Sequence, residues 1–113
     1  MRGYKLLLSG LSALGVLIGS EAQAYDLNNG RLLASNCTQC HSTNVLPKSG
    51  GYDSLVGESY NEIYVELREF KQKFNAVTKT CTENDPKECL MGVHAMPYTD
   101  QEMQDIAWYL SQR

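Results

Sequence analysis

The segment Cys37-Thr38-Gln39-Cys40-His41 constrains the fold of this chain more than any other part of the sequence. Two cysteines separated by two residues and followed at once by a histidine form the pattern that attaches a c-type haem. The two thiols bond the vinyl groups of the ring, which keeps the adjacent imidazole within reach of the iron. A chain with this anchor must fold around a large, flat, apolar ring. We therefore predict that Cys37, Cys40 and His41 bind haem, with His41 as the first axial ligand.

Two other kinds of site use a similar pair of cysteines. A thioredoxin-like redox motif needs a surrounding βαβ pattern, and a zinc site needs a second pair of ligands at finger-like spacing. The remaining cysteines, Cys81 and Cys89, have seven residues between them and do not resemble the second half of a zinc site. The sequence therefore favours haem attachment over both alternatives.

The first 24 residues have the layout of a secretory signal peptide. A positive start with Arg2 and Lys5 is followed by the apolar run 6–19 and by the small-residue cleavage pattern Ala22-Gln23-Ala24. The apolar run of about 14 residues is shorter than the roughly 20 that a membrane-spanning helix needs. We expect residues 1–24 to be removed on export to the periplasm, leaving no membrane span.

The mature chain 25–113 is expected to form one domain, because 89 residues remain after 24 of the 113 are removed. Chains of this size often depend on a cofactor or disulfides for stability. In an exported protein the even pair Cys81 and Cys89 predicts a disulfide, with two free thiols as the alternative. The formal net charge of −3 gives no support to nucleic-acid binding.

Capping residues and hydrophobic periodicity predict three helices. The first extends from about Leu27 to Cys37, with Asp26 as its N-cap. The second extends from Ser59 to about Ala76 and the third from Thr99 to Ser111, and each begins with a capping box. The segment Ser42 to Gly57 is rich in turn-forming residues and is expected to be a long loop. No segment alternates with period two, which argues against a β-sheet.

The second iron ligand must come from downstream, where four side chains are candidates. Met103 belongs to the apolar stripe of the last helix, and Met91 lies shortly after a cysteine whose covalent geometry constrains it. Met96 precedes Pro97, which favours an extended backbone in a loop just before the last helix. We predict Met96 as the second axial ligand, with His94 as its rival.

From Tyr25 to Arg113 the chain resembles the small monohaem cytochromes c. The resemblance is carried by Gly30 in a helix ahead of the C-x-x-C-H segment, a middle helix, and Met96-Pro97 before a last helix with Tyr109-Leu110. It implies an all-α small cytochrome c fold, with about three main helices and long loops around one covalently bound haem c. It also implies that Gly30 meets Tyr109 where the first and last helices cross, and that His41 and Met96 are the axial ligands.

In that family the proton of the proximal histidine is often accepted by the carbonyl of a proline. In this chain Asp53 occupies the corresponding position, within Gly51-Tyr52-Asp53-Ser54-Leu55. The acceptor is a main-chain carbonyl, which every residue has, so the hydrogen bond does not require proline.

An iron with two protein ligands has no open position for a substrate, and thioether ligation raises its reduction potential. The sequence therefore predicts an exported one-electron carrier rather than an enzyme. Its partners would be redox proteins, with no nucleic acid, and it would act as a monomer or within a complex. The alternatives are a haem c subunit of a larger oxidoreductase complex and a gas-binding or sensor cytochrome with a labile distal ligand.

Overall fold

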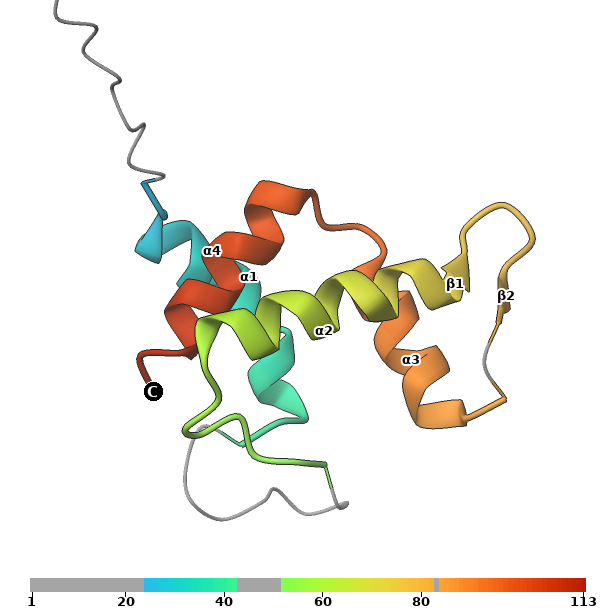
Figure 1. Cartoon of the computed structure of the whole chain (residues 1–113), viewed down its shortest axis with the longest axis horizontal. Coiled ribbons are helices and arrows are strands. Elements are labelled where there is room, and N and C mark those ends of the chain that lie inside the picture. The colour runs from blue at the N-terminus through green and yellow to red at the C-terminus, as the bar shows by residue number, and fades with distance from the viewer. Residues whose placement is uncertain (1–23, 43–51, 83) are drawn as a thin grey trace, which may run out of the picture.

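The computed structural model describes residues 24–42, 52–82 and 84–113. Its elements in chain order are α1 (Leu27–Ala34), the 3₁₀ helix η1 (Cys37–Gln39), α2 (Tyr60–Lys73), β1 (Phe74–Asn75), β2 (Thr80–Cys81), α3 (Pro86–Ala95) and α4 (Asp100–Leu110). Figure 1 shows α1 and α4 side by side near the start of α2, with α3 and the β1–β2 hairpin near its end. The described residues thus form the predicted all-α fold with one short hairpin.

The predicted starts of α1, α2 and α4 are confirmed. The Asp26 carboxylate accepts two backbone N–H groups in the first turn of α1. Capping boxes pair Ser59 with Glu62 at α2 and Thr99 with Glu102 at α4. These contacts satisfy N–H groups that have no partner within the helix, so each start is determined by residues close in sequence.

The crossing of α1 and α4 is as close as the sequence predicts. A Cβ atom added to Gly30 would lie 2.2 Å from the Asp105 carbonyl oxygen and 3.0 Å from the Tyr109 Cβ. The Asp105 carboxylate, on a residue only 3% exposed, accepts hydrogen bonds from the Asp26 N–H and the Asn29 side chain, each at 3.1 Å. The carboxylate therefore ties the start of α1 to α4 at the place where only glycine fits.

The hydrophobic core lies where all four α-helices meet, and α4 supplies half of its side chains. Met103 is 3% exposed, which confirms that it belongs to the core stripe. The buried apolar side chains are Ala34, Ile63, Leu67, Ala95, Met103, Ile106, Ala107 and Leu110.

Two helix ends and the absence of a sheet were predicted incorrectly. The α-helix at the N-terminus ends at Ala34, short of Cys37, and the chain continues as η1. Helix α2 ends at Lys73 rather than at Ala76, because Phe74 adopts an extended conformation and begins β1. An antiparallel ladder then pairs β1 with β2. Strands of two residues are too short to show a period of two, so this hairpin has no alternation signal.

Helix α3 was not predicted, and it changes the conformation of Met96. The Asp85 side chain accepts the Lys87 N–H at 2.7 Å and Pro86 occupies the first turn, which is a favourable start for a helix. Met96 is the C-cap of α3, with φ −54° and ψ −44°, and its N–H donates to the Gly92 carbonyl. The prediction of an extended Met96 was therefore wrong, because continuation of α3 outweighs the bias imposed by the following proline.

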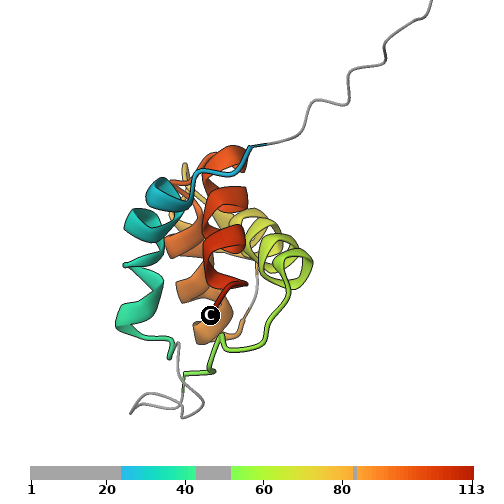
Figure 2. The same cartoon turned by 90° about the vertical axis from the view of Figure 1, so that its left-hand side faces the viewer.

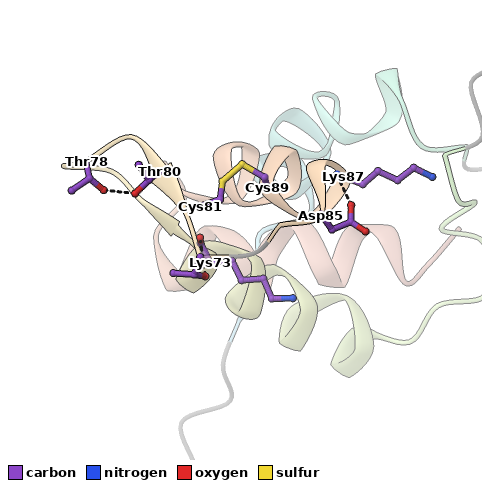
Figure 3. The surroundings of a disulfide bond; sticks show 8 residues. Lys73, Thr78, Thr80, Cys81, Asp85, Lys87 and Cys89 are labelled. Atoms are coloured by element: carbon purple, nitrogen blue, oxygen red, sulfur yellow. Dashed lines mark hydrogen bonds between the residues drawn. A yellow bond between two sulfur atoms is a disulfide. The ribbon is translucent and has the colours of Figure 1, made fainter.

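The predicted disulfide between Cys81 and Cys89 is confirmed. It joins β2 to α3, as Figure 3 shows. A salt bridge between Lys73 and Glu88, at 2.5 Å, adds a second link between α2 and α3. A Cβ atom on Gly92 would lie 2.9 Å from the Phe70 carbonyl oxygen, so α3 also packs closely on the end of α2.

Two predictions fall partly or wholly outside the described residues. The expected signal peptide concerns residues 1–24, of which only residue 24 is described, and the expected loop 42–57 includes residues 43–51, which are not. Residues 52–57 form no helix, as expected. Among the described residues, no helix is long and apolar enough to cross a membrane.

Candidate functional site

A cavity of about 400 Å³ lies between the C-x-x-C-H segment, α2 and α3. Cys37, Cys40 and His41 all line it, so the structure brings these three predicted site residues together. Figure 2 shows the α1–η1 segment and α2 on opposite sides of α3 and α4. Cavities of this size commonly hold small-molecule ligands and cofactors. The apolar residues that line it are Leu55, Ile63, Leu67, Phe70, Leu90, Ala95 and Leu110.

The orientation of His41 is set by main-chain contacts. Its N–H donates to the Cys37 carbonyl at 2.9 Å, within the tight turn of η1. Its Nδ1 atom lies 2.8 Å from the carbonyl oxygen of Asp53, the residue at the position that the family resemblance singles out. A carbonyl can only accept, so Nδ1 carries the proton and the Nε2 lone pair is left to bind a metal.

The two cysteines of the motif are half-buried, and neither is part of a disulfide. Burial raises the pKa of the Cys37 thiol, and the nearby Cys40 adds to this effect, while a backbone hydrogen bond opposes it. Both thiols line the same cavity as the His41 imidazole. They are therefore placed to form thioether bonds to a ring that occupies the cavity.

The candidates for the second ligand divide into two groups. Met91 and His94, both from α3, line the cavity. Met96 is not among the lining residues, and Met103 is buried in the core. The structure thus does not bring Met96 to the cavity together with the C-x-x-C-H residues. Sequence reasoning missed the contribution of α3, although the cap formed by Asp85 was visible in the sequence.

These residues fit a c-type haem. The cavity combines two thiols for covalent attachment, an imidazole with its Nε2 available, a thioether from a second element and mostly apolar walls. This is the donor set that proteins use to hold haem c.

Glu66 stands out among the polar residues of the cavity, because its pKa is shifted. Burial raises the pKa of its carboxyl group, and the neighbouring carboxylates of Glu58 and Glu62 raise it further. Glu58 also lines the cavity. Negative charge is therefore concentrated on the side of the cavity formed by the start of α2.

Comparison with known families agrees with this reading of the site. The family model described as Cytochrome c matches residues 27–113, from the first residue of α1 to the end of the chain. The match includes every cavity-lining residue named above. No curated protein and no solved structure matches the chain.

Proposed function

This chain belongs to the cytochrome c family, and from that premise we propose that it is an exported one-electron carrier with one covalently bound haem c. Family membership implies covalent haem c and redox partner proteins. Bound haem supplies a ferric/ferrous couple, which is the chemistry that one-electron transfer needs. Cytochromes c are generally carriers rather than enzymes, and we propose the same role here.

In this proposal the C-x-x-C-H segment provides three of the four bonds to the cofactor. Cys37 and Cys40 form the thioether bonds, and His41 binds the iron through Nε2. The hydrogen bond to the Asp53 carbonyl at 2.8 Å supports this role, because it fixes the tautomer and the ring orientation of His41.

We propose that the fourth bond comes from Met91 rather than from Met96. The supporting observation is that Met91 lines the cavity that Cys37, Cys40 and His41 also line, whereas Met96 does not. Two protein ligands would leave no open position on the iron, which suits a carrier. Met96 remains the ligand predicted from sequence, and the same experiment tests both residues.

The test compares Met91→Ala with Met96→Ala in the exported holoprotein. The ferric methionine–iron charge-transfer band should disappear in Met91→Ala, and the reduced protein should then bind carbon monoxide near neutral pH. The Met96→Ala variant, which removes the same side chain five positions away, should keep the band.

Loss of the band in Met96→Ala alone would restore the sequence-based assignment. Absence of the band from the parent protein, together with carbon monoxide binding to the reduced protein only in His94→Ala, would replace methionine by His94 as the second ligand.

We further propose that export removes residues 1–24, so that the mature chain begins at Tyr25. The aromatic ring of Tyr25 stacks on Trp108, with centroids 4.9 Å apart, and lies 5.2 Å from the ring of Tyr60. Tyr25 therefore packs against both α2 and α4. A cleavage before this residue leaves all of these contacts in the mature protein.

A further inference from the structure

We propose that the α-amino group freed by cleavage before Tyr25 is the cation that pairs with the buried Asp105 carboxylate, and that this ion pair holds α1 against α4. The inference rests on the proposed removal of residues 1–24. It goes beyond that proposal, because it gives the new N-terminus a charge-bearing role in the mature fold. Cleavage would then complete the contact between the first and last helices.

Asp105 is a buried carboxylate whose hydrogen-bond donors in the described part of the chain are neutral. It is 3% exposed. Its oxygens accept from the Asp26 N–H at 3.1 Å, the Asn29 side chain at 3.1 Å and the Gln101 side chain at 3.0 Å. No salt bridge among the described residues includes it. A buried charge without an opposite charge is costly, because neutral donors replace only part of its hydration.

A second carboxylate lies at the same place. The Asp26 side chain accepts the N–H groups of Asn28 at 2.9 Å and Asn29 at 3.0 Å. Asn29 therefore contacts both carboxylates, through its main chain and through its side chain. The start of a helix carries a positive partial charge of only about half an elementary charge. Two negative groups around the start of α1 thus leave a surplus that a cation would balance.

The main-chain nitrogen of Tyr25 is close enough to supply that cation. It precedes by one residue the Asp26 N–H that donates to Asp105 at 3.1 Å. Consecutive main-chain nitrogens are about 3–4 Å apart, so the Tyr25 nitrogen lies within about 7 Å of the carboxylate. In the uncleaved chain this nitrogen belongs to a neutral amide. After cleavage it is an amino group that is mostly protonated at neutral pH.

The side chain of Tyr25 fixes the position of its nitrogen. The Tyr25 ring stacks on Trp108 and also contacts Tyr60. Tyr25 is half-buried whereas Ala24 is exposed, so the cleaved end remains at the surface and water can reach the ammonium. Because the ring already orders this residue, forming the pair costs less conformational entropy than a salt bridge between two long, exposed side chains.

The pair would act at the start of a helix that leads to the proposed haem site. Helix α1 ends at Ala34, which has no exposed surface, and η1 begins three residues later at Cys37. The contacts of Asp105 hold the beginning of α1 on α4, and the burial of Ala34 holds its end. A firmly held α1 therefore positions the segment whose two thiols line the cavity.

The experiment compares two exported holoproteins that differ only in where the chain begins. One begins at Tyr25, and the other begins at Gln23, which moves the amino group roughly 7 Å along the chain and keeps Tyr25. Each is made as the parent and as Asp105→Asn. In denaturant unfolding, the longer start should raise the equilibrium constant for unfolding several-fold in the parent. In Asp105→Asn it should have little effect, because the carboxylate is gone.

Salt dependence adds a measurement that needs no substitution. The advantage of the Tyr25 start should shrink as salt is added, because screening weakens the ion pair. If Asp105→Asn fails to fold, Asp26→Asn replaces it, since asparagine caps a helix as well as aspartate does and removes one negative charge from the same place. The longer start should then have a smaller effect than in the parent. An equal effect in parent and variant, or an advantage that does not change with salt, would overturn the proposal.

Two further measurements separate this inference from the proposals on which it rests. The intact mass of the naturally processed protein identifies its first residue. A start at Tyr25 without coupling between the amino group and Asp105 rejects the ion pair alone, whereas a different start rejects the cleavage and this role of the amino group together. Absorption spectra in both redox states test the carrier function, so normal spectra without coupling leave that function intact.

Discussion

At the scale of single residues, the close crossing of α1 and α4 depends on one missing methyl group. Gly30 lets α1 lie against the main chain of α4, with only 2.2 Å between the position of a Cβ atom and the Asp105 carbonyl oxygen. The same contact holds the Asp105 carboxylate under the start of α1, where it accepts from the Asp26 N–H. A larger residue at position 30 must separate the two helices and weaken these hydrogen bonds.

We therefore predict that Gly30→Ala destabilises the holoprotein by about 1–3 kcal/mol, as overpacking of a tight site does. Denaturant unfolding measures the change. Asn28→Ala is the control, because Asn28 is exposed in the same helix and alanine is a better helix former there. Equal stability of Gly30→Ala and the parent protein would contradict the close crossing.

The candidate iron ligands differ in how well the local sequence predicts them. The C-x-x-C-H motif predicts its own three residues because they are adjacent in sequence and η1 folds them locally. A main-chain acceptor for His41 was expected without proline, because every residue has a carbonyl, and the structure shows that Asp53 supplies it. The choice among Met91, His94 and Met96 is different, because it depends on which way a helix faces.

At the scale of elements, α3 decides that choice. Its phase is set by Gly92 against α2, which turns Met91, His94 and Ala95 toward the cavity and leaves Val93 outside. The disulfide at Cys89, two residues before Met91, then holds the first half of the helix in place. The sequence pattern of this short helix is weak, so its orientation cannot be derived from local periodicity alone.

We predict that the disulfide positions the methionine ligand as well as stabilising the fold. The double variant Cys81→Ser, Cys89→Ser should lower the free energy of unfolding by about 2–3 kcal/mol, on the chain-entropy estimate for a short loop. It should also weaken the ferric methionine–iron band and lower the reduction potential. Thr80→Ser, a conservative change in the same strand, is the control. A less stable protein with an unchanged band and potential would leave the disulfide with a structural role only.

At the scale of the whole molecule, the cavity lies among the elements that make up the fold. Core residues Ile63, Leu67, Ala95 and Leu110 also line it, so the walls of the proposed haem site and the hydrophobic core are partly the same side chains. A cofactor held there completes the packing of a small domain, whose own core is limited. Folding and cofactor attachment are therefore expected to be linked.

The proposed processing of the chain is also tested at this scale. The intact mass of the exported holoprotein should equal that of residues 25–113 plus one haem. The aromatic contacts of Tyr25 should then be retained, because the cleaved bond precedes them. A mass that includes residues 1–24, or one that shows cleavage beyond Tyr25, would contradict the proposed start of the mature protein.

Sequence alone determined the features that depend on near neighbours. The caps of α1, α2 and α4 and the C-x-x-C-H anchor are formed by residues close in sequence. The even number of remaining cysteines was enough to predict their disulfide. Tertiary structure alone decided that the helix formed by residues 86–95 lines the cavity, and that Met91 rather than Met96 is among its lining residues. The physical reason is that the phase of this helix is set by the packing of Gly92 on the end of α2 and by the disulfide of Cys89 with β2, neither of which the local pattern of α3 determines.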